Sequence, residues 1–184
     1  NGADFACGAV TGIGSTSENA QLDGLRMFIS DLKLLGTGGE LVDAPIVAND
    51  TWAQARVALL DFEESCGDAG SAGTNTSVEV TVPAGEYTGV EFQLGLPFDL
   101  NHSDASSTDA AAPLNNAAMF WNWQGGYKFL RLDMKTGADA STAWNMHLGS
   151  TMCMSDTAVT PPTTECGRPN LPTISLDGYD STTQ

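Results

Sequence analysis

Two histidines are the residues of this chain best suited to hold a metal ion. They are His102, in a polar segment rich in Asn and Asp, and His147, in a short segment of alternating polarity. Imidazole is the commonest nitrogen ligand in proteins, and two imidazoles suffice for a low-coordinate Cu(I) site. Because the two histidines lie far apart in the sequence, only the fold can bring them together. The alternative is that each simply makes hydrogen bonds.

Thioether sulfur is a further type of copper ligand. Methionine is more often a residue that fills gaps in a core, so both roles are open for the four candidates, Met119, Met146, Met152 and Met154.

The most distinctive aromatic segment is FWNWQGGY, at positions 120–127. Its tryptophans, Trp121 and Trp123, are two positions apart, so in an extended segment both indoles face the same way. Such a pair could undergo oxidation, transfer electrons or stack on a sugar. It could equally be two large rings that cover one end of the fold.

Acidic and amide side chains gather in loops of a kind that can bind calcium through carboxylates and carbonyls. Their spacing does not match an EF-hand, which favours a solvated acidic surface; the residues are Asp43, Asn49, Asp50, Asp99, Asn101, Asp104 and Asp109. With 7 Lys and Arg against 23 Asp and Glu, the net charge of −16 argues against binding to nucleic acid or anionic lipid. No apolar run approaches the roughly 20 residues of a membrane-spanning helix.

No catalytic constellation stands out: the sequence offers no Ser-His-Asp ordering, no Cys-His dyad and no glycine-rich phosphate loop. Nothing in the sequence argues for hydrolytic chemistry, and we expect a binding protein and not an enzyme.

The four cysteines are Cys7, Cys66, Cys153 and Cys166, and none forms a CxxC pair. An even number of scattered cysteines in an acidic chain predicts two structural disulfides and an oxidising compartment. Of the three possible pairings we favour Cys7–Cys66 with Cys153–Cys166. Four buried free thiols are the alternative.

Short apolar segments separated by Gly, Pro and Asn turns predict an all-β fold, an antiparallel β-sandwich or barrel with long loops, in one domain over residues 1–184. The expected strands are 25–35, 57–62, 78–82, 90–94, 127–134, 143–148 and 174–176. The phase of the first changes near Ser30 and Asp31, which indicates a bulge or else a short helix. In 143–148, Trp144, Met146 and Leu148 would face the core and His147 the opposite side.

Taken together, these motifs resemble the MbnP family, the four-Cys-motif members of the metallo-mystery pair systems, related to copper-responsive surface proteins of methane-oxidising bacteria. The resemblance runs from about residue 5 to 178. It rests on LRMFISDLKLL, VALLDFE followed by Cys66, AGEYTGVEFQLGLPFDLNH, MFWNWQGGYKFLRL, MHLGSTMC and CGRPN, in this order.

The resemblance implies a β-rich protein of the periplasm or cell surface that binds copper through two histidines, here His102 and His147. It implies two disulfides among the four cysteines. It also implies a partner, a di-haem cytochrome c peroxidase of the MauG type, that oxidises a tryptophan to kynurenine. The matching target is the WxW motif, with Trp121 favoured over Trp123.

The chain departs from the family at both ends, which look cut: family members have an apolar strand before the first cysteine, and they continue past the region that matches residues 170–179. An edge strand supplied by a neighbouring molecule would give a self-assembling form. The alternative function is therefore an extracellular structural or adhesive β-module, with incidental metal binding.

Overall fold

The computed structural model describes residues 8–15, 17–64, 66, 73–107, 110–137 and 139–178. The regular secondary structure of the described part is almost entirely β-strands in antiparallel pairs, as predicted. Its strands are β1 (Gly8–Ile13), β2 (Glu18–Gly36), β3 (Leu41–Asp43), β4 (Ala53–Gln54), β5 (Val57–Asp61), β6 (Tyr87–Leu94), β7 (Phe120–Asn122), β8 (Gly126–Tyr127), β9 (Leu130–Thr136), β10 (Thr142–Leu148) and β11 (Thr173–Asp177). The helical elements are one turn each, α1 (Phe98–Asn101) and the 3-10 helix η2 (Ala117–Met119).

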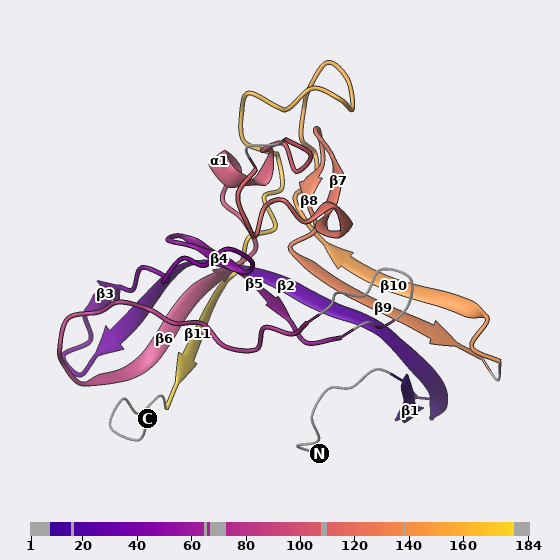
Figure 1. Ribbon diagram of the computed structural model, residues 1–184, viewed down its shortest axis with the longest axis horizontal. Helices are drawn as coiled ribbons and strands as arrows, with labels where there is room; N and C mark the ends of the chain where they lie inside the picture. The colour runs from indigo at the N-terminus through magenta and orange to yellow at the C-terminus, as the bar shows by residue number, and fades with distance from the viewer. Residues whose placement is uncertain are drawn as a thin grey trace.

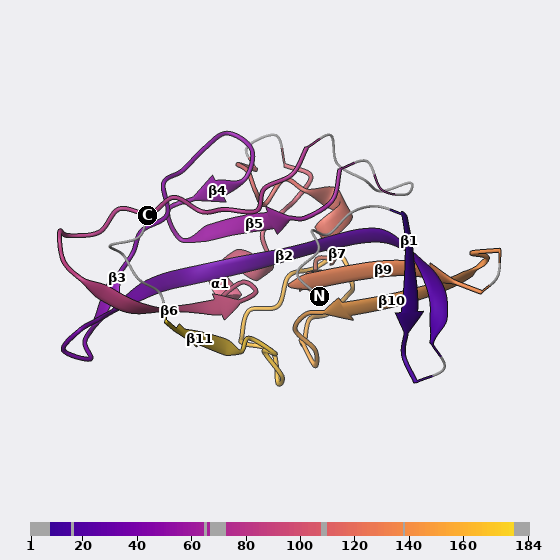
Figure 2. The same cartoon turned by 90° about the horizontal axis from the view of Figure 1, so that it is seen from below.

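A single 19-residue strand, β2, organises the sheet. Strands β5 and β9 both pair with Arg26 and Met27, so they lie on opposite edges of β2. Strand β1 pairs with residues of β2 that also pair with β9, and β3 pairs with residues of β2 that also pair with β6. Strands β1 and β3 therefore lie on the same edge of β2 as β5, whereas β6 lies on the same edge as β9. Outer strands β4, β11 and β10 then pair with β5, β6 and β9. Figures 1 and 2 show β2 crossing the molecule, with β9 and β10 beside one half and β6 and β11 beside the other.

Bulges let β2 change partners along its length. Its register with β6 shifts between Ser30 and Lys33, where Asp31 has a φ of 49°. An extra residue at a bulge bends a strand and increases its twist, so the two halves of β2 pair with different strands. The predicted bulge is confirmed and the short helix is wrong, while the strand is longer than the 25–35 expected.

The expectation of a barrel is wrong, because the sheet is open: nine of the described strands form one sheet around β2, and β7 and β8 form a separate two-stranded sheet. A sandwich would need a second large sheet, and the described residues contain none. The segment 78–82 is also not a strand; it makes only the isolated bridge between Ile46 and Val80. Its valines still pack against the core, which is why their alternation looked like a strand.

The largest apolar cluster joins the middle of β2 and strand β5 to the segments that carry the helical turns and the β7–β8 hairpin. Its bulkiest members are Phe28, Leu59, Tyr127 and Phe129, all at most 1% exposed. The polar segment 101–116, predicted as a loop, contributes Ala105 and Leu114 to this cluster.

Strand β10 has the alternating sequence of a half-buried strand, but most of its side chains are exposed. Trp144 is 44% exposed and Met146 is 45% exposed, so the prediction that they are core residues is wrong. The physical reason is position: β10 is the outermost strand beyond β9 in the described sheet, and no layer covers that face.

The predicted disulfide between Cys153 and Cys166 is confirmed. The second predicted bridge involves Cys7, which lies outside the described residues. No helix of the described part is both long enough and apolar enough to cross a membrane.

Candidate metal centre

The two histidines lie on segments that meet at the β7–β8 hairpin. His102 follows α1, which begins after Pro97, and His147 lies near the end of β10. Between them in the sequence comes the β7–β8 hairpin, which Figure 1 shows beside α1 and above the end of β10. This hairpin carries the WxW motif.

Asn101 ties these segments together. Its side chain is buried, its Oδ1 accepts a hydrogen bond from Tyr127 N at 2.8 Å, and its Nδ2 donates to Ser150 Oγ at 3.2 Å. The close approach requires glycine at position 126, because a Cβ there would collide with the Asn101 backbone and side chain, and because Gly126 has a φ of 74°. The amide therefore fixes α1 against the hairpin and the segment after β10.

The His102 imidazole is buried and held in one tautomer by its partners. Nδ1 donates to the Trp123 carbonyl oxygen at 3.1 Å, and Nε2 accepts from Asn101 Nδ2 at 3.2 Å. A carbonyl can only accept and an amide nitrogen can only donate, so the proton is assigned to Nδ1 and the lone pair to Nε2. Burial lowers the pKa of His102 below its usual value of 6.5, against the opposing effect of the Trp123 carbonyl. The ring is therefore neutral at pH 7.

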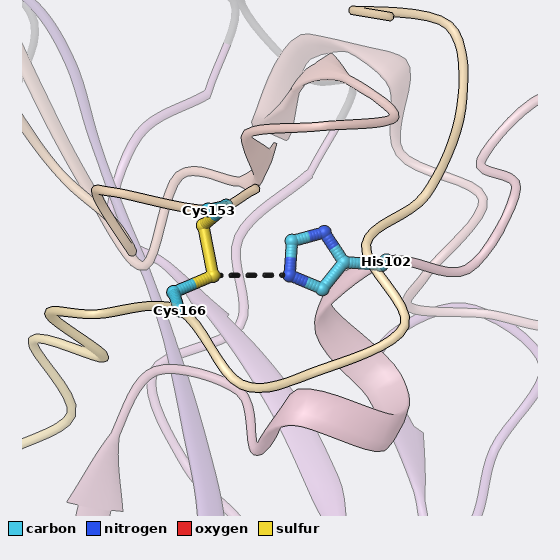
Figure 3. A group of neighbouring side chains, drawn as sticks. All are labelled: His102, Cys153 and Cys166. Carbon is cyan, nitrogen blue, oxygen red and sulfur yellow. Dashed lines mark hydrogen bonds between the residues drawn. A yellow bond between two sulfur atoms is a disulfide. The ribbon is translucent and has the colours of Figure 1, made fainter. Parts of the chain in front are cut away.

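The lone pair of His102 faces the disulfide. Figure 3 shows the ring directed at the bridge, with Nε2 at 3.5 Å from Cys166 Sγ. The Nε2 atom and the two sulfurs lie within 4.8 Å of one another, the one such group of three metal-binding side chains in the described part of the chain. While the sulfurs are bonded to each other, neither is a thiolate ligand.

His147 has a carboxylate partner. Its Nε2 lies 2.7 Å from Asp133 Oδ1, on the neighbouring strand β9, and Asp133 also accepts from Arg131. Desolvation alone would raise the pKa of Asp133, but the hydrogen bonds from His147 and Arg131 outweigh it and hold that pKa below its ordinary value. Because the carboxylate accepts, Nε2 of His147 carries a proton, and in the neutral tautomer the lone pair is on Nδ1.

The two tryptophans have different surroundings. Trp121 is 40% exposed, and its ring centroid lies 6.4 Å from that of His147. Trp123 follows the end of β7, in the hairpin turn, and meets the Phe120 ring edge-on at 6.2 Å. The motif is extended only as far as Asn122, and Trp123 lies in a turn. The extended geometry behind the expectation that both indoles face the same way therefore does not hold, and the two rings meet different partners.

The WxW segment is the structural link between the histidines. It touches His102 through the Trp123 carbonyl and His147 through the Trp121 ring. Between the two imidazoles themselves, the described side chains show no direct hydrogen bond.

The other predicted ligands are dispersed. Met119 is fully buried in the main core cluster, which is the gap-filling role, whereas Met146, Met152 and Met154 are exposed. Three of the acidic calcium candidates have protein partners: Asp43 lies 3.9 Å from Lys33, Asp99 pairs with Arg56 at 2.8 Å, and Asp104 accepts from Ser106. Calcium binding stays a prediction with no located site.

Sequence reasoning missed the partners of the histidines. Neither the role of Asn101 nor that of Asp133 had a signal in local spacing, because each acts across strands or segments distant in the chain. One signal was available for Asp133: an acidic residue on the strand expected next to that of His147.

Comparison with known proteins agrees with the motif analysis. The family model for MbnP matches residues 1–184. The structure is similar to that of MbnP from Methylosinus trichosporium, with a TM-score of 0.82 and 28% sequence identity over 98% of this chain and 68% of that chain. A search of the curated proteins finds no match. Sequence motifs, family model and fold coincide over nearly the whole chain, and the chain therefore belongs to the MbnP family.

Proposed function

We propose that this chain is a secreted copper-binding protein in which His102 and His147 hold the metal and a WxW tryptophan is oxidised by a di-haem partner. The proposal makes the chain a carrier and a protein substrate, with no catalytic activity of its own. A periplasmic or cell-surface location accords with the disulfide between Cys153 and Cys166.

The observation that carries the proposal is how each imidazole is held. Metal-binding histidines usually donate their second ring nitrogen to a carbonyl or a carboxylate, which orients the ring and raises its basicity. His102 donates to the Trp123 carbonyl, and His147 pairs with the Asp133 carboxylate. Each ring thus has one further nitrogen that can bind a metal: Nδ1 of His147, and Nε2 of His102 once the metal displaces its hydrogen bond from Asn101 Nδ2. Two neutral nitrogens form a donor set that suits Cu(I), and a net charge of −16 attracts cations.

Trp121 is the better candidate for oxidation by a docked enzyme. Its ring is the more exposed of the two, and it lies beside His147, whereas the Trp123 ring meets Phe120. A haem enzyme that removes electrons from the surface would reach Trp121 first, and the resulting kynurenine would lie next to one of the proposed ligands.

Removing the carboxylate behind His147 tests the copper site without removing a ligand. Asp133→Asn should weaken Cu(I) binding about 10- to 100-fold, the usual effect of losing an outer-shell partner. The measurement is competition against a chromophoric Cu(I) chelator. Asp177→Asn, on the exposed strand β11, makes the same charge change away from the site and serves as the control. His147→Ala with undiminished Cu(I) affinity would contradict the proposal.

Mass spectrometry of the peptide that spans residues 119–128 tests the modification. Protein isolated from cells that carry the di-haem partner should show one tryptophan that has lost one carbon and gained one oxygen. Fragmentation should assign the change to Trp121. An unmodified peptide from such cells would contradict the proposed oxidation and leave the copper measurement unaffected.

The alternative role, a self-assembling surface module, is favoured by strand β10. It is an outer strand of the described sheet with Trp144 and Met146 exposed, and outer strands can pair with another chain. A solution mass measurement separates the two roles, because a stable monomer at high concentration excludes assembly through β10.

A further inference from the structure

The buried group formed by His102 and the disulfide has a donor set unlike that of the copper site proposed above. It contains Nε2 of His102 and the sulfurs of Cys153 and Cys166, all within 4.8 Å of one another. Figure 3 shows the ring edge directed at the bridge from one side. Imidazole nitrogen with two thiolates is a soft set that binds Cu(I) strongly once the sulfurs are free.

The backbone holds the two cysteines together without help from the sulfur–sulfur bond. Thr151 and Arg168 exchange a pair of hydrogen bonds, at 2.9 and 3.0 Å, and Gly167 N donates to Met152 O at 3.0 Å. These bonds flank Cys153 and Cys166 directly. Cleavage of the disulfide therefore leaves two thiols side by side, with the chain around them still paired.

The imidazole is also held in place from outside the group. The Trp123 carbonyl fixes Nδ1, and this bond does not depend on the oxidation state of the sulfurs. The Nε2 lone pair has one hydrogen-bond donor in range, Asn101 Nδ2 at 3.2 Å. This amide also donates to Ser150, so it keeps a partner when a metal takes Nε2.

A cavity gives access to the bridge. It has a volume of about 250 Å³, and its lining includes Phe98, Ser150, Glu165 and Cys166. Both cysteines are buried, at 8% and 6% exposure, and Cys166 lines the cavity, so the cavity offers a small thiol or a metal ion a route toward the bridge.

We propose that the Cys153–Cys166 disulfide is a redox gate for a second metal site, in which the two thiolates and His102 Nε2 bind Cu(I) after reduction. The reductant is a thiol: two RSH convert the disulfide to two cysteine thiols and form RSSR, so two electrons and two protons enter the protein. Cu(I) then replaces the two thiol protons, which are released to solvent. Three donors match the low coordination numbers that Cu(I) accepts, whereas a structural zinc site needs four.

This site shares His102 with the two-histidine site and does not use His147. Oxidation state would therefore decide whether His102 serves the outer, two-histidine site or the inner, thiolate site. The inference stands on the geometry around the disulfide and does not depend on tryptophan oxidation.

The test uses His147→Ala as background, because this variant removes the two-histidine site and keeps the thiolate site. Cu(I) binding to the whole protein is measured by chelator competition before and after treatment with a phosphine reductant. The oxidised variant should bind weakly, and the reduced variant should bind one equivalent tightly, with a thiolate-to-copper absorption band in the ultraviolet. Alkylation of the reduced protein should be blocked by Cu(I) at Cys153 and Cys166.

Two matched variants in this background isolate the ligands. His147→Ala/Cys153→Ser/Cys166→Ser keeps the remaining cysteines, so it reveals any Cu(I) that they bind after reduction. This variant should not bind the one equivalent of Cu(I) that the reduced parent binds tightly. His147→Ala/His102→Ala should lose affinity by at least the roughly 10- to 100-fold of an outer-shell change. If the cysteine variant unfolds, alkylation of the reduced parent before copper addition replaces it and should abolish binding.

Equal Cu(I) affinity in the reduced parent and the cysteine variant would overturn the thiolate site. Full affinity without His102 would overturn the three-ligand assignment. If the oxidised His147→Ala variant still binds Cu(I) tightly, the two-histidine proposal fails. The thiolate site is then still decided by whether reduction increases the Cu(I) affinity.

Discussion

Replacing Asn101 by alanine should lower the free energy of unfolding, because this side chain joins the segments that carry the histidines. The side chain is 1% exposed and makes three hydrogen bonds, to Tyr127 N at 2.8 Å and to Ser150 Oγ and His102 Nε2 at 3.2 Å each. Removal takes the side-chain acceptor from the buried Tyr127 N–H, which costs about 1–3 kcal/mol. The two longer bonds add about 0.5–1.5 kcal/mol each.

The sum is a loss of about 2–6 kcal/mol in the free energy of unfolding. For a chain of this length, a loss of about 3 kcal/mol lowers Tm by roughly 6–12 °C. Urea denaturation followed by tryptophan fluorescence, with the Cys153–Cys166 disulfide intact, measures the change directly. Asn115→Ala is the matched control, because Asn115 is exposed and its loss should change stability by no more than about 0.5 kcal/mol.

A loss below about 1 kcal/mol for Asn101→Ala would refute the reasoning. It would mean that the Tyr127 N–H and the His102 lone pair find equivalent partners without the amide, so that Asn101 would not be the junction between α1, the hairpin and the segment after β10.

The remaining predictions concern packing. Gly126→Ala should destabilise the protein more than Gly39→Ala, as measured by urea denaturation. Both glycines have positive φ, but only at position 126 would a Cβ collide with Asn101; equal losses would show that the backbone there moves freely. Phe28→Ala should cost about 3–5 kcal/mol because the ring is fully buried in the main cluster. Met154→Ala, at a side chain 76% exposed, should stay within about 0.5 kcal/mol in the same assay.

Local patterns in the sequence determined much of the secondary structure. The alternation of 25–35 and the phase change at Ser30 and Asp31 predicted a bulged strand, and β2 contains that bulge. The pairing of Cys153 with Cys166 was also within reach, because a short loop joins them. Such features depend on neighbours in the chain, whose periodicity and proximity are visible in one dimension.

The sequence alone was misleading wherever burial depends on distant partners. The alternation of 143–148 is genuine, yet Trp144 and Met146 are exposed because β10 lies at the edge of the sheet. Alternation states which side chains share a face and does not state whether anything covers it. For the same reason the sequence suggested a sandwich or barrel where one long strand, β2, organises an open sheet.

The sequence by itself determined the chemistry available to this protein: two imidazoles, a tandem-tryptophan motif, four cysteines and a strongly acidic surface. Only the tertiary structure decided how these groups are held. It set the Trp123 carbonyl behind His102, the Asp133 carboxylate behind His147, and the disulfide in front of the His102 lone pair. Each of these contacts joins residues from different segments, and hydrogen-bond partners across such distances follow from the packing of the whole chain.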